Sequence, residues 1–155
     1  MKQPRMLEVL EQFRIVFKSI RRHYQSVERR AGISGAQLWA LAQIAGRPGL
    51  KVGDLAKGLA IHQSTASNLL RRLEGLGLVT RRRQGKDQRM VALFATPQGL
   101  KVLKRAPQPL SGVLQQALSD LPAGNLTVLR RELGKLIAAM KTKDLEARAT
   151  PLSDI

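Results

Sequence analysis

The sequence predicts a mainly α-helical fold with a small antiparallel β-wing, that is, a winged helix-turn-helix flanked by N- and C-terminal dimerisation helices. Two apolar stripes at helical spacing stand either side of a three-residue turn, a basic hairpin follows them, and both ends of the chain are amphipathic. The 155 residues suffice for one domain with a sizeable core. We expect the winged helix-turn-helix over 34–99, dimerisation helices over 1–31 and 100–141, and a frayed tail over 142–155.

The N-terminal stretch carries apolar residues every three or four positions, which predicts a long amphipathic helix. These residues are Met6, Leu10, Phe13, Phe17, Ile20, Tyr24 and Val27. Ser34 and Gln37 then fit a capping box, which places the start of a second helix there. Leu41 and Ile44 continue this helix, and the glycines and proline of residues 46–49 end it.

Two short helices with one buried face each are expected next. Their apolar stripes consist of Val52, Leu55, Ala56 and Leu59, and of Ala66, Leu69, Leu70 and Leu73. Residues 60–62 between them suit the tight turn of a helix-turn-helix. Lys51 offers the first helix no obvious side-chain cap, and the second helix is expected to end at Gly75 or Gly77.

The second helix of this pair has a polar face opposite its apolar stripe, with groups that base edges and phosphates require. Its members are Gln63, Ser64, Thr65, Ser67, Asn68, Arg71 and Arg72. Those near the start of the helix are candidates for reading base edges, namely Ser64, Thr65, Ser67 and Asn68. Arg71 and Arg72 come later and are expected to hold phosphates.

A basic hairpin follows, with strand-like alternation over 78–83 and 88–95 and turn residues between them. We expect the apolar residues to face inward and the arginines outward; the two sets are Val79, Val91, Leu93 and Ala95, and Arg81, Arg83 and Arg89. Residues 81–89 hold five cationic side chains and one carboxylate. An isolated run of this kind is commonly solvated surface. Beside a helix-turn-helix, however, it indicates a DNA-binding role. The candidate DNA ligands are Arg81, Arg83, Lys86 and Arg89.

The residues from 52 to 99 resemble the MarR family of bacterial transcription regulators, whose wing motif is Asp-x-Arg followed by Leu-Thr-x-x-Gly after a strand. The matching residues are Asp87, Arg89, Thr96 and Gly99, with further matches over 52–56, 64–67 and 73–81. Ala95 departs from the usual Leu, and Lys51 stands where a capping Thr is common. Neither departure removes a DNA-contact group.

The resemblance implies a homodimer that binds double-stranded DNA at a pseudo-palindromic operator. It also implies a small aromatic or anionic effector, held between the dimer helices and the winged lobe. Arg89 would enter the minor groove or pack the wing against Asp87, and we interpret Asp87 as structural because its carboxylate repels phosphate. The candidate effector residues are Arg14, His23, Tyr24 and Trp39, although core or interface packing explains them more simply.

The composition also favours nucleic acid as the binding partner. The formal net charge is +16, and ten of these excess charges lie between Arg47 and Arg105. No hydrophobic run approaches the ~20 residues of a membrane span, and no signal-peptide core follows Met1, so we expect a cytoplasmic protein that does not insert into a membrane. The absence of cysteine excludes disulfides and thiol-based sensing.

The C-terminal third is expected to be helical with one interruption. Thr96 and Pro97 fit a helix start, and an apolar stripe continues through Leu100, Leu103, Leu110, Leu114, Ala117 and Leu121. Pro107 and Pro109 interrupt this stripe, which predicts a kink or break near Ala106. A last helix carries Leu126, Leu129, Leu133, Leu136 or Ile137, and Met140. From Ala147 onward no stripe remains.

No catalytic motif, metal site or cofactor site is found in the sequence: His23 and His62 lack carboxylate or histidine partners at ligand spacing. The leading interpretation is a sequence-specific, homodimeric repressor released by an effector. One alternative is an architectural protein that binds duplex with little sequence preference. Another is an interaction module whose basic wing meets an acidic protein. A monomer with paired terminal helices is the alternative to the dimer.

Overall fold

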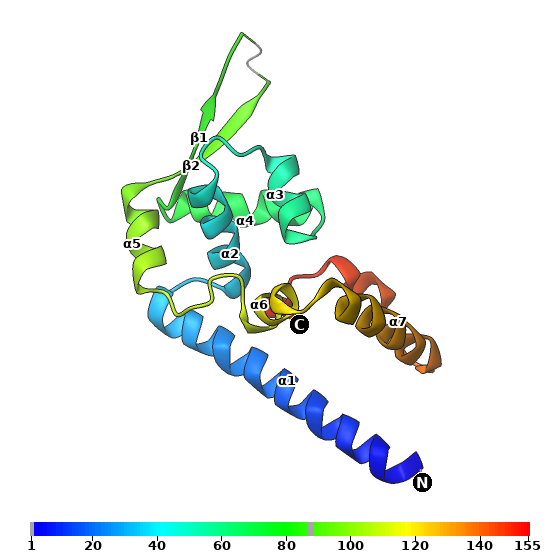
Figure 1. Cartoon of the computed structure of the whole chain (residues 1–155). Coiled ribbons are helices and arrows are strands. Elements are labelled where there is room, and N and C mark those ends of the chain that lie inside the picture. The colour runs from blue at the N-terminus through cyan, green and yellow to red at the C-terminus, as the bar shows by residue number, and fades with distance from the viewer. Residues whose placement is uncertain (1, 87–88) are drawn as a thin grey trace.

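The computed structural model describes residues 2–86 and 89–155 as a mainly helical chain with a two-stranded antiparallel sheet, which confirms the predicted fold class (Figure 1). The helices and strands are α1 (Lys2–Ala31), α2 (Gly35–Gly46), α3 (Val52–Leu59), α4 (Gln63–Gly75), β1 (Val79–Arg83), β2 (Val91–Ala95), α5 (Pro97–Arg105), α6 (Val113–Asp120) and α7 (Ala123–Ala139). Two 3₁₀ turns follow, Leu145–Ala149 and Leu152–Asp154.

The helix starts follow the predicted capping chemistry. At α2, the Ser34 N–H donates to Gln37 Oε1 (3.0 Å) and the Gln37 N–H donates to Ser34 Oγ (3.1 Å), which completes the capping box. At α5, the Gly99 N–H donates to Thr96 Oγ1 (3.1 Å). Helix α3 begins after Lys51 without a side-chain cap, and α4 ends at Gly75, both as expected.

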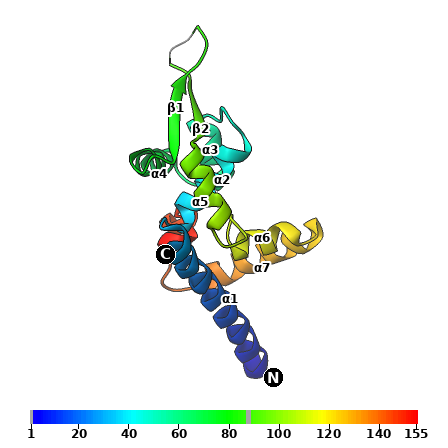
Figure 2. The same ribbon diagram turned by 90° about the vertical axis from the view of Figure 1, so that its left-hand side faces the viewer.

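The core is built around α2, which packs against α1, α3, α4, α5 and β2. Its Leu38, Leu41 and Ile44 are completely buried. They meet fully buried side chains from the helix-turn-helix and the wing, among them Leu55, Leu70, Leu73 and Leu93. In both views the wing projects away from α1 and α7, with α2 between them (Figures 1 and 2). Helix α2 therefore joins the winged lobe to α1 and to the second 3₁₀ turn.

The wing register corrects the predicted facing of its arginines. Strand β1 pairs antiparallel with β2, so that Arg81 lies opposite Leu93 and Arg83 opposite Val91. Directly opposed residues share one face of a sheet, so these arginines are on the face that we expected to be apolar and inward. They are nevertheless exposed because the strands extend beyond the core. The root of the wing is anchored where the Leu93 N–H donates to the Leu50 carbonyl (2.9 Å).

The predicted interruption of the C-terminal helix is a complete break. Helix α5 ends at Arg105, and Ala106 adopts an extended backbone. The next helix begins only at Val113. Two prolines within this connection explain the break, since each lacks the N–H that a continuing helix needs.

The tail differs from the expectation that residues 142–155 fray. The second of its two 3₁₀ turns, Leu152–Asp154, lies against α1 and α2, and the Ala36 N–H donates to Ser153 Oγ (3.1 Å). Leu152 is half-buried beside it. Individual side chains make these contacts instead of a helical stripe, so periodicity in the sequence could not reveal them.

Gly99, in the Thr-x-x-Gly motif, lies where α5 crosses the start of the wing. A Cβ at Gly99 would meet the Leu78 carbonyl oxygen at 2.3 Å and Leu41 Cδ1 at 3.1 Å. The first of these atoms belongs to the backbone and cannot move aside cheaply. The glycine therefore permits a close approach between α5 and the chain leaving α4.

We predict that Gly99→Ala lowers the free energy of unfolding by about 1–3 kcal/mol, because the added methyl group overpacks this crossing. Gly53→Ala is the matched control, since no heavy atom lies within 4 Å of its added Cβ. It should be neutral or stabilising by at most ~1 kcal/mol, as expected for alanine in a helix. Urea unfolding measures both variants, and equal effects would contradict the steric explanation.

Candidate nucleic-acid interface

Helix α4 has one buried face and one face open to solvent. Ala66, Leu69, Leu70 and Leu73 are buried against the core. On the other face, all the predicted DNA-binding residues of α4 are accessible, with Thr65 and Ser67 half-buried. The exposed members are Gln63, Ser64, Asn68, Arg71 and Arg72. This arrangement gives the helix the accessible polar face that a major groove requires.

The turn before α4 sets its direction. Ala60 closes α3 in the left-handed conformation (φ 54°, ψ 44°), with its N–H directed at the carbonyls of Ala56 and Lys57. The Ile61 N–H also donates to the Ala56 carbonyl (3.1 Å). These bonds satisfy the last carbonyls of α3 and turn the chain sharply. The three-residue turn that the sequence predicts therefore directs α4 away from α3 at once.

Two of the candidate DNA ligands on α4 contact each other. Arg71 Nη1 donates to Asn68 Oδ1 at 3.3 Å, and both side chains are exposed. We assigned Asn68 to base readout and Arg71 to phosphate. The contact restricts the rotamers of both side chains before DNA binds. It is weak because water competes for the same donor and acceptor, so breaking it to bind DNA costs little free energy.

The first two arginines of the wing are held by groups of the protein itself. Arg81 forms an ion pair with Glu74 at the end of α4, and both side chains are about one-third exposed (38% and 32%). The Arg82 guanidinium lies 5.0 Å from the centre of the Phe94 ring, in a cation–π contact. Glu74 and Arg82 are not among the residues selected from the sequence, because neither contact is visible without the strand register.

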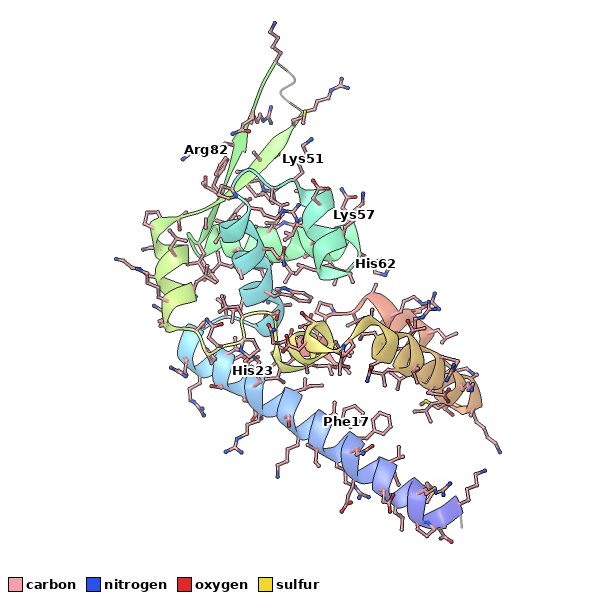
Figure 3. The ribbon with its side chains drawn as sticks, viewed as in Figure 1. Phe17, His23, Lys51, Lys57, His62 and Arg82 are labelled. Atoms are coloured by element: carbon pink, nitrogen blue, oxygen red, sulfur yellow. The ribbon has the colours of Figure 1, made fainter. Side chains whose placement is uncertain are left out.

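The remaining wing candidates Arg83, Lys86 and Arg89 are exposed. Asp87 lies outside the described residues, so its structural role stays a prediction. Figure 3 shows Lys51, Lys57 and His62 on the α3 side of the lobe, and Arg82 on the other side of the wing. Lys51 and Lys57 are exposed cations that the sequence analysis did not select. Their position on the first helix of the helix-turn-helix suits contact with a DNA backbone.

The four candidate effector residues do not form one cluster. Tyr24 and Trp39 line a cavity of about 260 Å³ between α2, the α3–α4 turn and the tail. The His23 ring lies beside that of Tyr24, with ring centres 5.7 Å apart and the planes tilted by 58°, whereas Arg14 is exposed on α1. Sequence reasoning missed Gln115, whose Nε2 donates to the Tyr24 hydroxyl (3.1 Å).

Burial perturbs the two aromatic acid–base groups near this cavity. Burial lowers the pKa of His23 below its usual value, and a hydrogen bond to the backbone of Pro109 opposes this only in part. Burial also raises the pKa of the Tyr24 hydroxyl. Both groups are therefore favoured in their neutral forms.

Residues 2–86 and 89–155 hold neither a metal-binding cluster of side chains nor a helix suited to crossing a membrane. No group of three or more histidine, cysteine, aspartate or glutamate side chains there could hold a metal ion. No helix in the same residues is both long and apolar enough to cross a membrane.

Comparison with known proteins adds to this geometry. A sequence profile described as MarR family matches residues 31–90, from the end of α1 through β1 to the residue before β2. The HTH-type transcriptional repressor MdtR of Bacillus subtilis (strain 168) is 23% identical over 139 residues, which cover 90% of both chains. Among solved structures, the S. aureus MepR–DNA complex has a TM-score of 0.58 and 25% identity, covering 84% of this chain and 96% of that one. BldR from Sulfolobus solfataricus has a TM-score of 0.55 and 26% identity, covering 90% and 99%.

We predict that Glu74→Gln strengthens binding to any duplex, because it removes the carboxylate that neutralises Arg81. The slope of log affinity against log salt should steepen by about 0.9, the value for one additional phosphate contact. Asp120→Asn is the matched control, since it also removes one carboxylate that accepts a side-chain hydrogen bond, from Gln116, but on α6. Fluorescence anisotropy at several salt concentrations measures both variants. Weaker binding by Glu74→Gln would show instead that the ion pair positions Arg81 for DNA.

Proposed function

The chain belongs to the MarR family of winged helix-turn-helix transcriptional regulators, and on that premise we propose that it is a homodimeric repressor released by a small-molecule effector. The proposal depends most on one observation: the exposed polar face of α4 lies beside a basic wing while its opposite face is fixed in the core. Its relative MdtR is named a repressor, and MepR was solved with DNA. The proposed place of action is the cytoplasm.

In this proposal α4 enters the major groove and the wing follows the DNA backbone or the adjacent minor groove. The candidates for base readout stand in the first two turns of α4 and are Ser64, Thr65, Ser67 and Asn68. Arg71 and Arg72 come later on the helix, within reach of phosphates. Arg83, Lys86 and Arg89 supply the cations of the wing.

The terminal helices support the homodimer. Apolar side chains are exposed along α1 and α7, among them Ile15 (66%), Phe17 (65%), Val128 (48%) and Leu136 (44%). Helices α1, α6 and α7 also border an open, largely apolar groove of about 1230 Å³. An exposed apolar surface of this extent typically packs against a partner. A second copy is the partner we propose, because a two-fold axis would cover the same helices of both chains.

The two-fold axis also determines the kind of operator. Two recognition helices in such a dimer stand about 34 Å apart, the length of one duplex turn, so the half-sites form a pseudo-palindrome. A net charge of +16 favours a second candidate, an architectural protein that binds duplex without strong sequence preference. The two differ in specificity, since a sequence reader gains roughly 4–10 kcal/mol at its operator over random duplex.

Selection from a pool of random duplexes, followed by sequencing, tests the proposal at near-physiological salt with purified protein. We expect recovery of one pseudo-palindrome with half-sites about ten base pairs apart. Tight binding without any motif would support the architectural candidate. Lack of duplex binding even at low salt would contradict both and favour an acidic protein partner.

Single substitutions should separate base readout from backbone contact. We predict that Asn68→Ala relaxes specificity at one position of each half-site, with a loss of about 1–3 kcal/mol of discrimination. Arg89→Ala should weaken binding to all duplex sequences alike. It should also reduce the slope of log affinity against log salt by about one. Quantitative binding to the operator and to its single-base variants measures both effects. The reverse pattern would overturn the assignment.

The dimer should depend on the groove and not on other exposed apolar residues. We predict that Leu136→Asp, in the groove wall, gives a monomer, because it buries unpaired carboxylates at the interface. Leu100→Asp on α5 is the matched control, since Leu100 is equally exposed (47% against 44%). Light scattering after size-exclusion chromatography distinguishes the two. A dimer that survives Leu136→Asp would place the interface elsewhere.

A further inference from the structure

Helix α5 carries a basic face that neither the proposed recognition surface nor the proposed dimer uses. Gly99 and Val102 are buried against the core, whereas Lys101, Lys104 and Arg105 are exposed. At about 100° per residue, the two lysines lie on the side of the helix opposite these buried residues. The whole of α5 is described, and none of its residues lines the groove beside α1 and α7, so a second copy seated there leaves the basic face open.

The last turn of α1 extends this basic face. Arg29 and Arg30 are exposed there, and Nη2 of the Arg105 guanidinium donates to the Ala31 carbonyl (3.5 Å). This contact places the ends of α1 and α5 side by side. We name the exposed cations of α5 and of the last turn of α1 the flank surface; they are Arg29, Arg30, Lys101, Lys104 and Arg105.

The flank surface has few carboxylates to neutralise it. Residues 29–53 and 88–119 contain no aspartate or glutamate. Glu28 precedes the first of these segments, but it lines the groove. Within residues 2–86 and 89–155, no ion pair involves a cation of the flank surface. Its charge is therefore available to an anionic partner, and five cations on one face favour a polyanion over a single small anion.

The flank surface continues from the outer side of the wing. Helix α5 begins two residues after the end of β2 and packs against that strand. Figure 1 shows α5 on the opposite side of α2 from α3, and Figure 3 shows Arg82 on the side of the wing away from α3. Arg82 is exposed although its guanidinium packs on the Phe94 ring. Cations therefore run from the root of the wing along α5 to the end of α1.

A path of this length and position fits duplex DNA. The nine residues of α5 extend over about 13 Å, and a duplex carries about eight phosphates over that length. Figure 1 shows α5 on the side of the winged lobe away from α7, where the flanks of an operator leave the proposed dimer. A duplex must bend to follow the cations, and phosphate contacts offset the elastic energy of such a bend. An acidic protein has no need of the alignment of α5 with the wing.

We propose that the flank surface binds the phosphate backbone of duplex DNA beyond the recognised half-site, and that the duplex bends past the wing onto α5 and the end of α1. The inference rests on the proposed function, because it requires that α4 and the wing bind duplex. It adds a second contact region on each lobe, which holds flanking DNA without reading its sequence. The protein would therefore shape the DNA around its operator as well as recognise it.

Two lengths of duplex test the inference. The short probe has about 24 base pairs, which accommodates two half-sites one turn apart, and the long probe has about 60. Both carry at their centre the sequence most enriched in the selection from random duplexes. We expect the full-length protein to bind the long probe about tenfold more tightly, with a steeper slope of log affinity against log salt.

Ring closure measures the bend itself. A duplex of about 150 base pairs, the persistence length of DNA, closes slowly into a circle with DNA ligase. We expect bound protein to speed this closure several-fold, because it bends the duplex on both sides of the half-sites.

Paired substitutions identify the surface responsible. Lys101→Gln/Lys104→Gln removes two cations of the flank surface, and glutamine keeps a helix propensity close to that of lysine. Lys2→Gln/Arg5→Gln is the matched control, since it removes two exposed cations at the same spacing from the start of α1, which lies away from the wing (Figure 1). Only the first variant should lose the preference for the long probe and the faster ring closure. Its salt slope on the long probe should fall by about 0.9 for each lysine that contacts a phosphate, while its affinity for the short probe stays within about twofold of wild type.

The inference is wrong if Lys101→Gln/Lys104→Gln binds both probes like wild type, which would leave the flank surface to water or to an acidic protein. It is also wrong if this variant weakens binding to both probes equally, or if Lys2→Gln/Arg5→Gln causes the same loss, since either result would indicate an effect of net charge alone. Ring closure that bound protein does not speed would contradict the bend.

These measurements separate the inference from the proposed function. Tight binding of the short probe without any gain from longer flanks would reject the inference alone. A gain from the flanks when the selection recovers no motif would reject the sequence-specific regulator alone and support the architectural candidate. Binding to neither probe would reject both.

Discussion

Burial of α2 is the constraint on which the rest of the structure depends. Leu38, Leu41 and Ile44 are fully buried on a helix that is apolar around most of its circumference, so every side of it needs a covering element. Helix α1 covers one side, α3 and α4 another, and α5 and β2 the remainder. One helix thus packs against α1, the second 3₁₀ turn of the tail and the winged lobe at once.

The wing is the part least supported by this core. A two-stranded ribbon is marginally stable on its own, and most of β1 is exposed. Among the described residues, the contacts that support it include the Leu50–Leu93 bridge at its root, the Glu74–Arg81 ion pair and the packing of Arg82 on Phe94. Two of these contacts use cations that would otherwise face phosphate. The wing thus divides its arginines between its own structure and the proposed DNA contact.

The two hollows of the molecule differ in how they are closed. The groove beside α1 and α7 is open, large and bordered by exposed apolar side chains, which suits a surface covered by another chain. The cavity under the helix-turn-helix is small, and the tail of the same chain already covers it. The two hollows are neighbours, since Tyr24, Leu152, Ser153 and Ile155 line both of them.

Features that depend on neighbouring residues could be predicted from the amino-acid sequence. The capping box at Ser34, the cap at Thr96, the two stripes of the helix-turn-helix and the break after Arg105 all follow from spacing and from the chemistry of single residues. These features were enough to predict the fold class, the polar face of α4 and the basic composition of the wing.

Only the tertiary structure decided the contacts between distant segments. The strand register placed Arg81 and Arg83 on the apolar face, Glu74 proved to be the partner of Arg81, and Ser153 docked on α2 from 117 residues away. The cavity, too, gathers side chains from α1, α2, α4, α6 and the tail. Local periodicity carries no information about such pairs, because they depend on how the helices are packed together and not on the order of residues within any one of them.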